Sequence, residues 1–138
     1  MRTAFSCVAA VAFACGGSSG MRQLSVGGTY ATQVTLLPGS TCSAAPVRDN
    51  PTEVAHTPGA GTLSLTHAGT VYSGTVTPTG AFSVPGTAVG GGAFTISIAG
   101  QFSAMGFTAT THVVQSQPSC SYDVSWVGTK SGDPNTFP

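Results

Sequence analysis

The sequence contains very little charge. Only 6% of its residues are Asp, Glu, Lys or Arg, whereas about 25% is usual for a globular domain. Lys and Arg number 4 in total, and the formal net charge is zero. This composition leaves no basic surface to hold a phosphate backbone or to attract anionic lipid headgroups. We therefore expect no nucleic-acid partner.

Motifs for catalysis are also missing. No G-x-S-x-G sequence is present to expose a nucleophilic serine. The run Gly90-Gly91-Gly92 is followed by neither a lysine nor a helical pattern, so it does not predict a phosphate-binding loop. The few acids fall into no pair suited to glycoside hydrolysis. They are Asp49, Glu53, Asp123 and Asp133.

The histidines give the best case for a metal or catalytic site, and it is weak. Glu53 and His56 would share one face of a helix, but Pro51 and Pro58 flank them and disfavour a helix. His67 falls in phase with the leucines of a predicted strand. We therefore predict no catalytic residue, no metal ligand and no cofactor, and a protein that is not an enzyme.

The longest apolar run lies at the N-terminus, from Ala4 to Ala14, after a single positive charge at Arg2. It is too short to cross a bilayer and has the length of a signal-peptide core. We predict a signal peptide over residues 1–14. Ala12-Phe13-Ala14 also fits an ordinary signal peptidase site, which would release a soluble secreted protein beginning at Cys15.

The stretch that follows, Cys15-Gly-Gly-Ser-Ser-Gly20, resembles the processing site of bacterial lipoproteins. The resemblance implies that Cys15 becomes the first mature residue and carries diacylglycerol, although Ala12 stands where the family usually has Leu. Gly16 in place of Asp implies sorting to an outer membrane or the cell surface. Residues 15–27, rich in Gly and Ser, then read as a flexible tether, and the membrane is the expected partner.

With Cys7 in the signal peptide and Cys15 lipidated, Cys42 and Cys120 remain in an oxidising compartment. A disulfide between them is the simplest prediction, and on a chain-entropy model it would stabilise the fold by about 4–5 kcal/mol. A metal pair or a redox couple would favour closely spaced cysteines, as in C-x-x-C.

Residues 28–138 show the two-residue alternation of β-strands and no helical period. Turn signals such as Thr77-Pro-Thr-Gly80 separate short strands, and we expect an irregular stretch over residues 40–61, a bulge or bend at Gly100 and a loosely docked tail from Gly128. We predict an all-β domain, a small antiparallel sandwich or barrel of about seven strands. The predicted core is Val34, Leu36, Leu63, Leu65, Tyr72, Val76, Phe82, Phe94, Ile96, Ile98, Phe102, Phe107, Val124 and Trp126.

Residues 56–76 and 120–132 are similar in cadence to small uncharacterised bacterial lipoproteins, a resemblance that implies a family and no activity. Two functions follow as hypotheses. The first is a lipid-anchored cell-envelope protein whose β-domain is structural or binds a partner protein. The second is a small barrel that binds an apolar ligand, because strand parity sends many aromatic residues inward.

Overall fold

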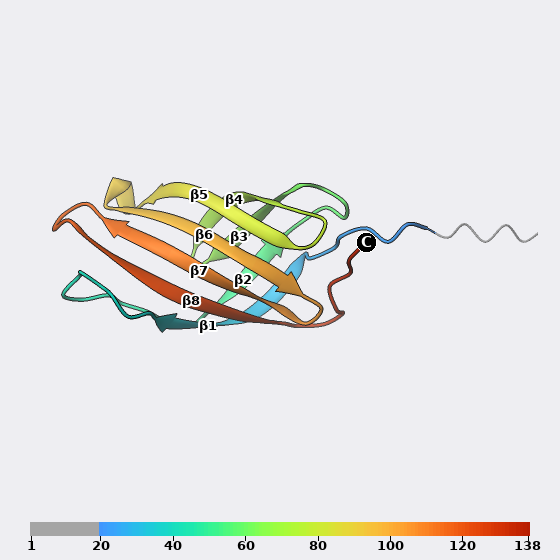
Figure 1. Ribbon diagram of the computed structural model, residues 1–138, viewed down its shortest axis with the longest axis horizontal. Coiled ribbons are helices and arrows are strands. Elements are labelled where there is room, and N and C mark those ends of the chain that lie inside the picture. Colours follow the sequence, from blue (N-terminus) through green and yellow to red (C-terminus); the bar gives the residue numbers. More distant parts are fainter. Residues whose placement is uncertain (1–19) are drawn as a thin grey trace, which may run out of the picture.

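The chain folds as a closed antiparallel barrel of eight strands (Figure 1). The computed structural model describes residues 20–138, so the predicted signal peptide and Cys15 lie outside the described residues. Each strand pairs with its neighbours in sequence, and β8 closes the barrel against β1. The predicted all-β class is confirmed. The strands are β1 Gly28–Leu36, β2 Asn50–Ala55, β3 Thr62–His67, β4 Thr70–Val76, β5 Ala81–Val89, β6 Phe94–Ser103, β7 Gly106–Gln115 and β8 Cys120–Lys130.

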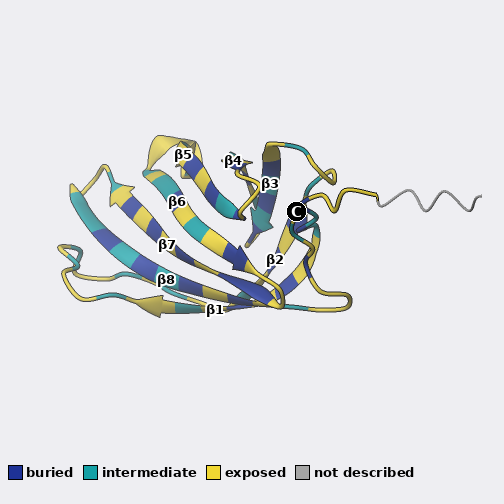
Figure 2. Cartoon of the chain, turned by 45° about the vertical axis from the view of Figure 1, so that its right-hand side comes forward, coloured by how far each residue is buried: buried dark blue, intermediate teal, exposed yellow. Residues whose placement is uncertain are grey.

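The alternation in the sequence becomes an inside and an outside, because a strand directs successive side chains to opposite faces of its sheet. Figure 2 shows this as alternating buried and exposed bands along the strands. Most of the predicted core is buried. Leu36 is an exception at 39% exposed, because it ends β1 at the rim, and Val34, Phe94 and Ile96 are only partly buried.

The strand that the sequence analysis did not predict is β2. It lies inside residues 40–61, which were expected to be irregular. Its burial alternates, with Thr52 and Val54 buried and their neighbours exposed. Pro51 lies next to the start of the strand and is exposed, in register with Ala31 of β1. A proline is tolerated near the beginning of a strand, where a missing N–H costs little of the ladder.

The pairing of Gly100 shows no bulge, which was one of the two irregularities, a bulge or a bend, expected at this glycine. Gly100 lies in regular register with both Phe82 and Ala109, and the irregularity falls instead between Val84 and Thr87 of β5. Gly100 is required for space, because a Cβ there would lie 2.6 Å from the ring of Phe82.

One end of the barrel is filled by aromatic rings and by both ends of the described chain. These residues form a plug, and the filled end is also called the plugged end. Leu24 and Val26 are buried, and Ser25 pairs with Thr136. The folded domain therefore begins before Gly28, the residue at which the predicted tether was expected to end. The C-terminal segment, predicted to be loosely docked, is packed against the barrel, where Asn135 is buried. The rings of this filled end are Tyr30, Phe82, Phe102 and Phe107, with centroids 4.7–5.9 Å apart.

Polar contacts hold the filled end together. The Tyr30 hydroxyl lies 2.7 Å from the carbonyl oxygen of Val26 and 2.8 Å from Asn135 Oδ1. Lys130 Nζ donates to the same Asn135 oxygen, and Asn135 Nδ2 donates to the Ser103 carbonyl. Burial raises the pKa of Tyr30 to about 12, so its hydroxyl stays protonated.

The opposite end carries the long β1–β2 loop, residues 37–49. The predicted disulfide between Cys42 and Cys120 is present and ties this loop to the start of β8. Three hydrogen bonds between Thr41 and Ser121 reinforce the link. The Thr41 amide and hydroxyl donate to the Ser121 carbonyl, and the Ser121 amide donates to the Thr41 hydroxyl. No helix in the part of the chain that the structure describes is long and apolar enough to span a membrane.

Candidate ligand-binding cavity

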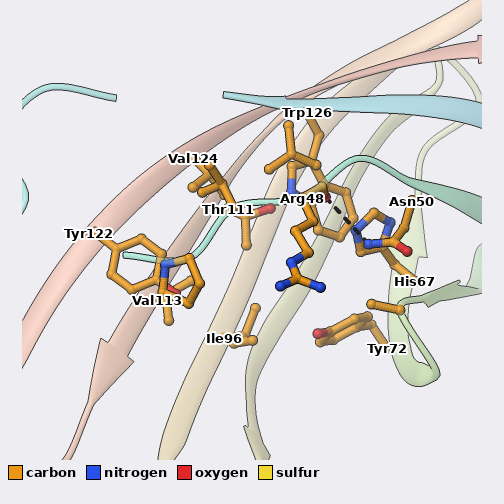
Figure 3. Close-up of a pocket in the computed structure, with 14 residues that line it drawn as sticks. Arg48, Asn50, His67, Tyr72, Ile96, Thr111, Val113, Tyr122, Val124 and Trp126 are labelled. Carbon is orange, nitrogen blue, oxygen red and sulfur yellow. Dashed lines mark hydrogen bonds between the residues drawn. The ribbon is translucent and has the colours of Figure 1, made fainter. Parts of the chain in front are cut away.

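A cavity of about 260 Å³ lies inside the barrel at the end opposite the aromatic plug (Figure 3). Seven strands contribute to its wall, together with the β1–β2 loop and the turn between β3 and β4. The lining residues are Val34, Pro46, Val47, Arg48, Asn50, His67, Ala68, Tyr72, Ile96, Thr111, Val113, Tyr122, Val124 and Trp126.

The strand alternation explains why these side chains meet. Thr111 and Val113 are successive inward positions of β7, and they pair with Val124 and Tyr122 of β8. Trp126 is the next inward position of β8. An eight-stranded barrel has an interior just wide enough for side chains to fill it or for one small ligand. Here aromatic rings fill one end, while a cavity remains at the other.

The wall of the cavity is mostly apolar, with a flat aromatic surface on one side. The rings of His67 and Trp126 are stacked, with centroids 4.2 Å apart and an angle of 30° between their planes. Both are buried. Such a surface suits a planar apolar ligand, because aromatic rings stack with an offset at this separation.

Two threonines connect His67 to the backbone of β1. Thr52 Oγ1 lies 2.9 Å from His67 Nδ1 and 2.8 Å from Thr32 Oγ1. Thr32 Oγ1 in turn lies 3.3 Å from the Tyr30 carbonyl oxygen. These contacts hold the imidazole ring in place through Nδ1.

Burial also lowers the pKa of His67 below its ordinary value. The neutral imidazole is therefore favoured at neutral pH. A neutral ring stacks on Trp126 without placing a charge in the cavity wall.

Thr111 is a buried polar residue without a partner. Its hydroxyl oxygen has no hydrogen bond, and the residue is only 2% exposed. Leaving such a group unpaired costs about 1–3 kcal/mol. Thr111 lines the cavity, so a rotation of its side chain would present the hydroxyl to a polar atom of a ligand.

The other polar side chains of the cavity are those of Arg48, Asn50, Tyr72 and Tyr122. Asn50 Nδ2 donates to the Arg48 carbonyl oxygen. Arg48 comes from the β1–β2 loop, and Figure 3 shows its guanidinium reaching toward the middle of the cavity. Burial raises the pKa of both Tyr72 and Tyr122, so their hydroxyls stay protonated. The cavity lining contains no Asp or Glu.

The residues weighed for metal binding or catalysis are not brought together. Glu53 lies outside the barrel and His67 inside it, because Thr52 is the residue of β2 that pairs with His67. Asp49 Oδ1 accepts a hydrogen bond from the Val34 amide. His56 uses both ring nitrogens, on the Val26 amide and the Ala60 carbonyl. No group of three potential metal ligands occurs within residues 20–138.

Sequence reasoning considered Trp126 and Tyr122 as a surface for stacking a ligand but favoured a place in the core for both, and it missed Arg48 and Thr111. A signal for Thr111 does exist, because it occupies an inward phase between Ala109 and Val113. Arg48 gives no comparable signal, since loop residues have no periodicity.

Comparison with protein-family models, with curated proteins and with solved structures gives no match.

Proposed function

We propose that this protein binds a small, mainly apolar ligand inside its barrel. The observation that carries the proposal is the cavity itself, with its stacked aromatic wall and an unpaired buried hydroxyl. Side chains of a purely structural barrel would be expected to fill both ends. Few polar groups on an apolar wall are typical of ligand sites.

The cavity volume limits the size of the ligand. At about 260 Å³ it exceeds a cavity of about 150 Å³ that takes up benzene. It falls slightly short of the range of about 300–1,000 Å³ for drug-sized molecules. A ligand of one or two rings fits these limits.

Trp126 is the only tryptophan of the chain and lines the cavity, so its single indole N–H signal reports directly on binding. In NMR titrations of ¹⁵N-labelled protein with the neutral probe 2-naphthamide, we expect this signal to shift and saturate. A signal that does not move, in a protein that is folded, contradicts the proposal.

Two neighbouring valines provide a matched pair of variants. Val113→Phe adds a ring inside the cavity and is expected to abolish binding of the probe. Val114→Phe adds the same ring on the outer face, where Val114 is 39% exposed, and is expected to leave binding unchanged. Equal affinities in the two variants would place the probe elsewhere.

We further propose that the protein is a lipoprotein of the bacterial cell envelope, anchored through Cys15, and that it is not an enzyme. The disulfide is compatible with export into an oxidising compartment. Gly20 follows Cys15 by five positions and lies at the plugged end of the barrel. Acyl chains on Cys15 would therefore leave the mouth of the cavity facing away from the membrane.

Mass spectrometry of the N-terminal peptide from membrane-extracted protein tests the anchor. We expect the peptide to begin at Cys15 and to carry the mass of a diacylglyceryl group, and Cys15→Ser to remove both. Retention of Met1, or an unmodified Cys15 in the native protein, would refute this part of the proposal and leave ligand binding untouched.

A further inference from the structure

We infer that the ligand is a small organic carboxylate, with its apolar body inside the barrel and its carboxylate at Arg48. The inference rests on the proposed function, since it names the class of ligand that the cavity takes. The inference comes from two polar groups of the cavity that lack partners in the lining, the Arg48 guanidinium and the Thr111 hydroxyl.

The charge of the lining is the first step. Arg48 is positively charged at all physiological pH values, and no carboxylate lines the cavity to neutralise it. The one salt bridge among the described residues joins His112 to Asp123, and the neighbouring Asp49 is engaged with the Val34 amide. An anion at the mouth would therefore meet a guanidinium that no acid occupies.

The buried hydroxyl is the second and independent step. Thr111 Oγ1 is unpaired and inaccessible to solvent, and Figure 3 shows it turned toward the side of the cavity on which Arg48 lies. A carboxylate has two oxygens, which can accept from the guanidinium and, once the Thr111 side chain rotates toward the cavity, from this hydroxyl. The phenol groups of Tyr72 and Tyr122 supply further donors in the same lining.

The apolar wall decides between kinds of anion. Val34, Ile96, Val113 and Val124 surround the space behind Arg48, so a fully hydrated ion such as inorganic phosphate would lose water there without compensation. One guanidinium also matches a single negative charge better than a doubly charged phosphate. A monocarboxylate on one or two rings satisfies both parts of the cavity.

The test compares 2-naphthoate with 2-naphthamide, which have the same rings and differ in charge. Using isothermal titration calorimetry on the full chain with its disulfide formed, we expect 2-naphthoate to bind about tenfold or more tightly, since a hydrogen bond to a charged group has this order of effect. Arg48→Gln is expected to remove that preference while leaving the affinity for 2-naphthamide within about twofold.

Arg22→Gln is the matched control, because Arg22 is an exposed cation outside the cavity lining, and the preference should survive it. Thr111→Val is expected to weaken 2-naphthoate several-fold. If both probes bind equally, or if the preference persists in Arg48→Gln, the carboxylate inference is wrong and the proposed function stands. If neither probe binds the folded wild-type protein, both are overturned.

Discussion

Inside the barrel, successive hydrogen bonds connect Thr32, Thr52 and His67. The hydroxyl of Thr111, by contrast, has no hydrogen-bond partner among the described residues. The four side chains are similarly buried, so their hydrogen bonding and not their exposure separates them. A protein keeps an unpaired buried group at a cost in stability, and such groups concentrate at functional sites.

Thr111→Val should therefore stabilise the ligand-free protein, by about 1 kcal/mol, because it replaces the unpaired hydroxyl with a methyl group of similar shape. Urea unfolding measures the change. Thr52→Val is the matched control and should destabilise by about 1–3 kcal/mol, because it breaks the chain that holds His67. Equal destabilisation by the two variants would show that Thr111 has a partner in solution.

His67 should make the protein less stable in mild acid. Its pKa in the native state lies below the ordinary value of 6.5 because of burial. As the pH falls below about 6.5, the unfolded chain gains a proton at His67 that the native state does not, so the free energy of unfolding decreases. The loss is complete once the pH is below the lowered native pKa.

Thermal unfolding between about pH 7.5 and pH 5 measures this loss. His67→Gln, which can keep a hydrogen bond to Thr52, should unfold with a smaller dependence on pH than the wild type. An unchanged dependence in the variant would assign the acid sensitivity to other groups.

Among the neighbouring strand pairs of the barrel, β4 and β5 share the fewest register pairs. They share two register pairs, Thr75 with Ser83 and Val76 with Phe82, whereas β7 and β8 share ten. Register pairs between β4 and β5 end at Ser83, and the pairing of β5 with β6 shifts just beyond it, between Val84 and Thr87. The barrel is closed in topology, but its hydrogen bonding is uneven around the circumference.

Gly100 shows how tightly the other end is packed. An added Cβ would lie 2.6 Å from both the Phe82 ring and Ala109 Cβ, so Gly100→Ala should destabilise by about 1–3 kcal/mol through overpacking. Gly61→Ala is the control, since the nearest atom to its Cβ would be 3.9 Å away. Chemical denaturation compares the two. A Gly100 variant as stable as the Gly61 variant would mean that the plug can relax.

The strands that sequence reasoning could predict are those with long, regular alternation, such as β6 and β7. It missed β2, where only Thr52 and Val54 point inward and Pro51 removes an amide. It also placed Leu24 and Val26 in a tether, because two apolar residues among glycines and serines carry no period. Their burial is decided by residues far along the chain, such as Thr136.

For the whole molecule, the sequence could not distinguish a sandwich from a barrel. That difference depends on whether β1 pairs with β8, a contact between Val34 and Trp126 that local pattern does not encode. The disulfide prediction needed only cysteine counting and an inferred compartment. The cavity required the three-dimensional arrangement, since it comes from where large and small inward residues fall around the circle.

The plug should be an integral part of the fold. Leu24 is 3% exposed, so Leu24→Ala should lower the free energy of unfolding by about 2–5 kcal/mol, as for other buried leucines. Met21, 93% exposed, provides the control, and Met21→Ala should change little. Urea unfolding of both variants distinguishes a packed plug from a loosely attached segment, for which the two changes would be alike.

The C-terminal residue, Pro138, is exposed and lies at the plugged end (Figure 1). A biotin handle attached after it would hold the protein on a sensor chip with the cavity turned toward the flowing solution. Small molecules could then be screened in their hundreds against one immobilised sample, without the support obstructing their entry.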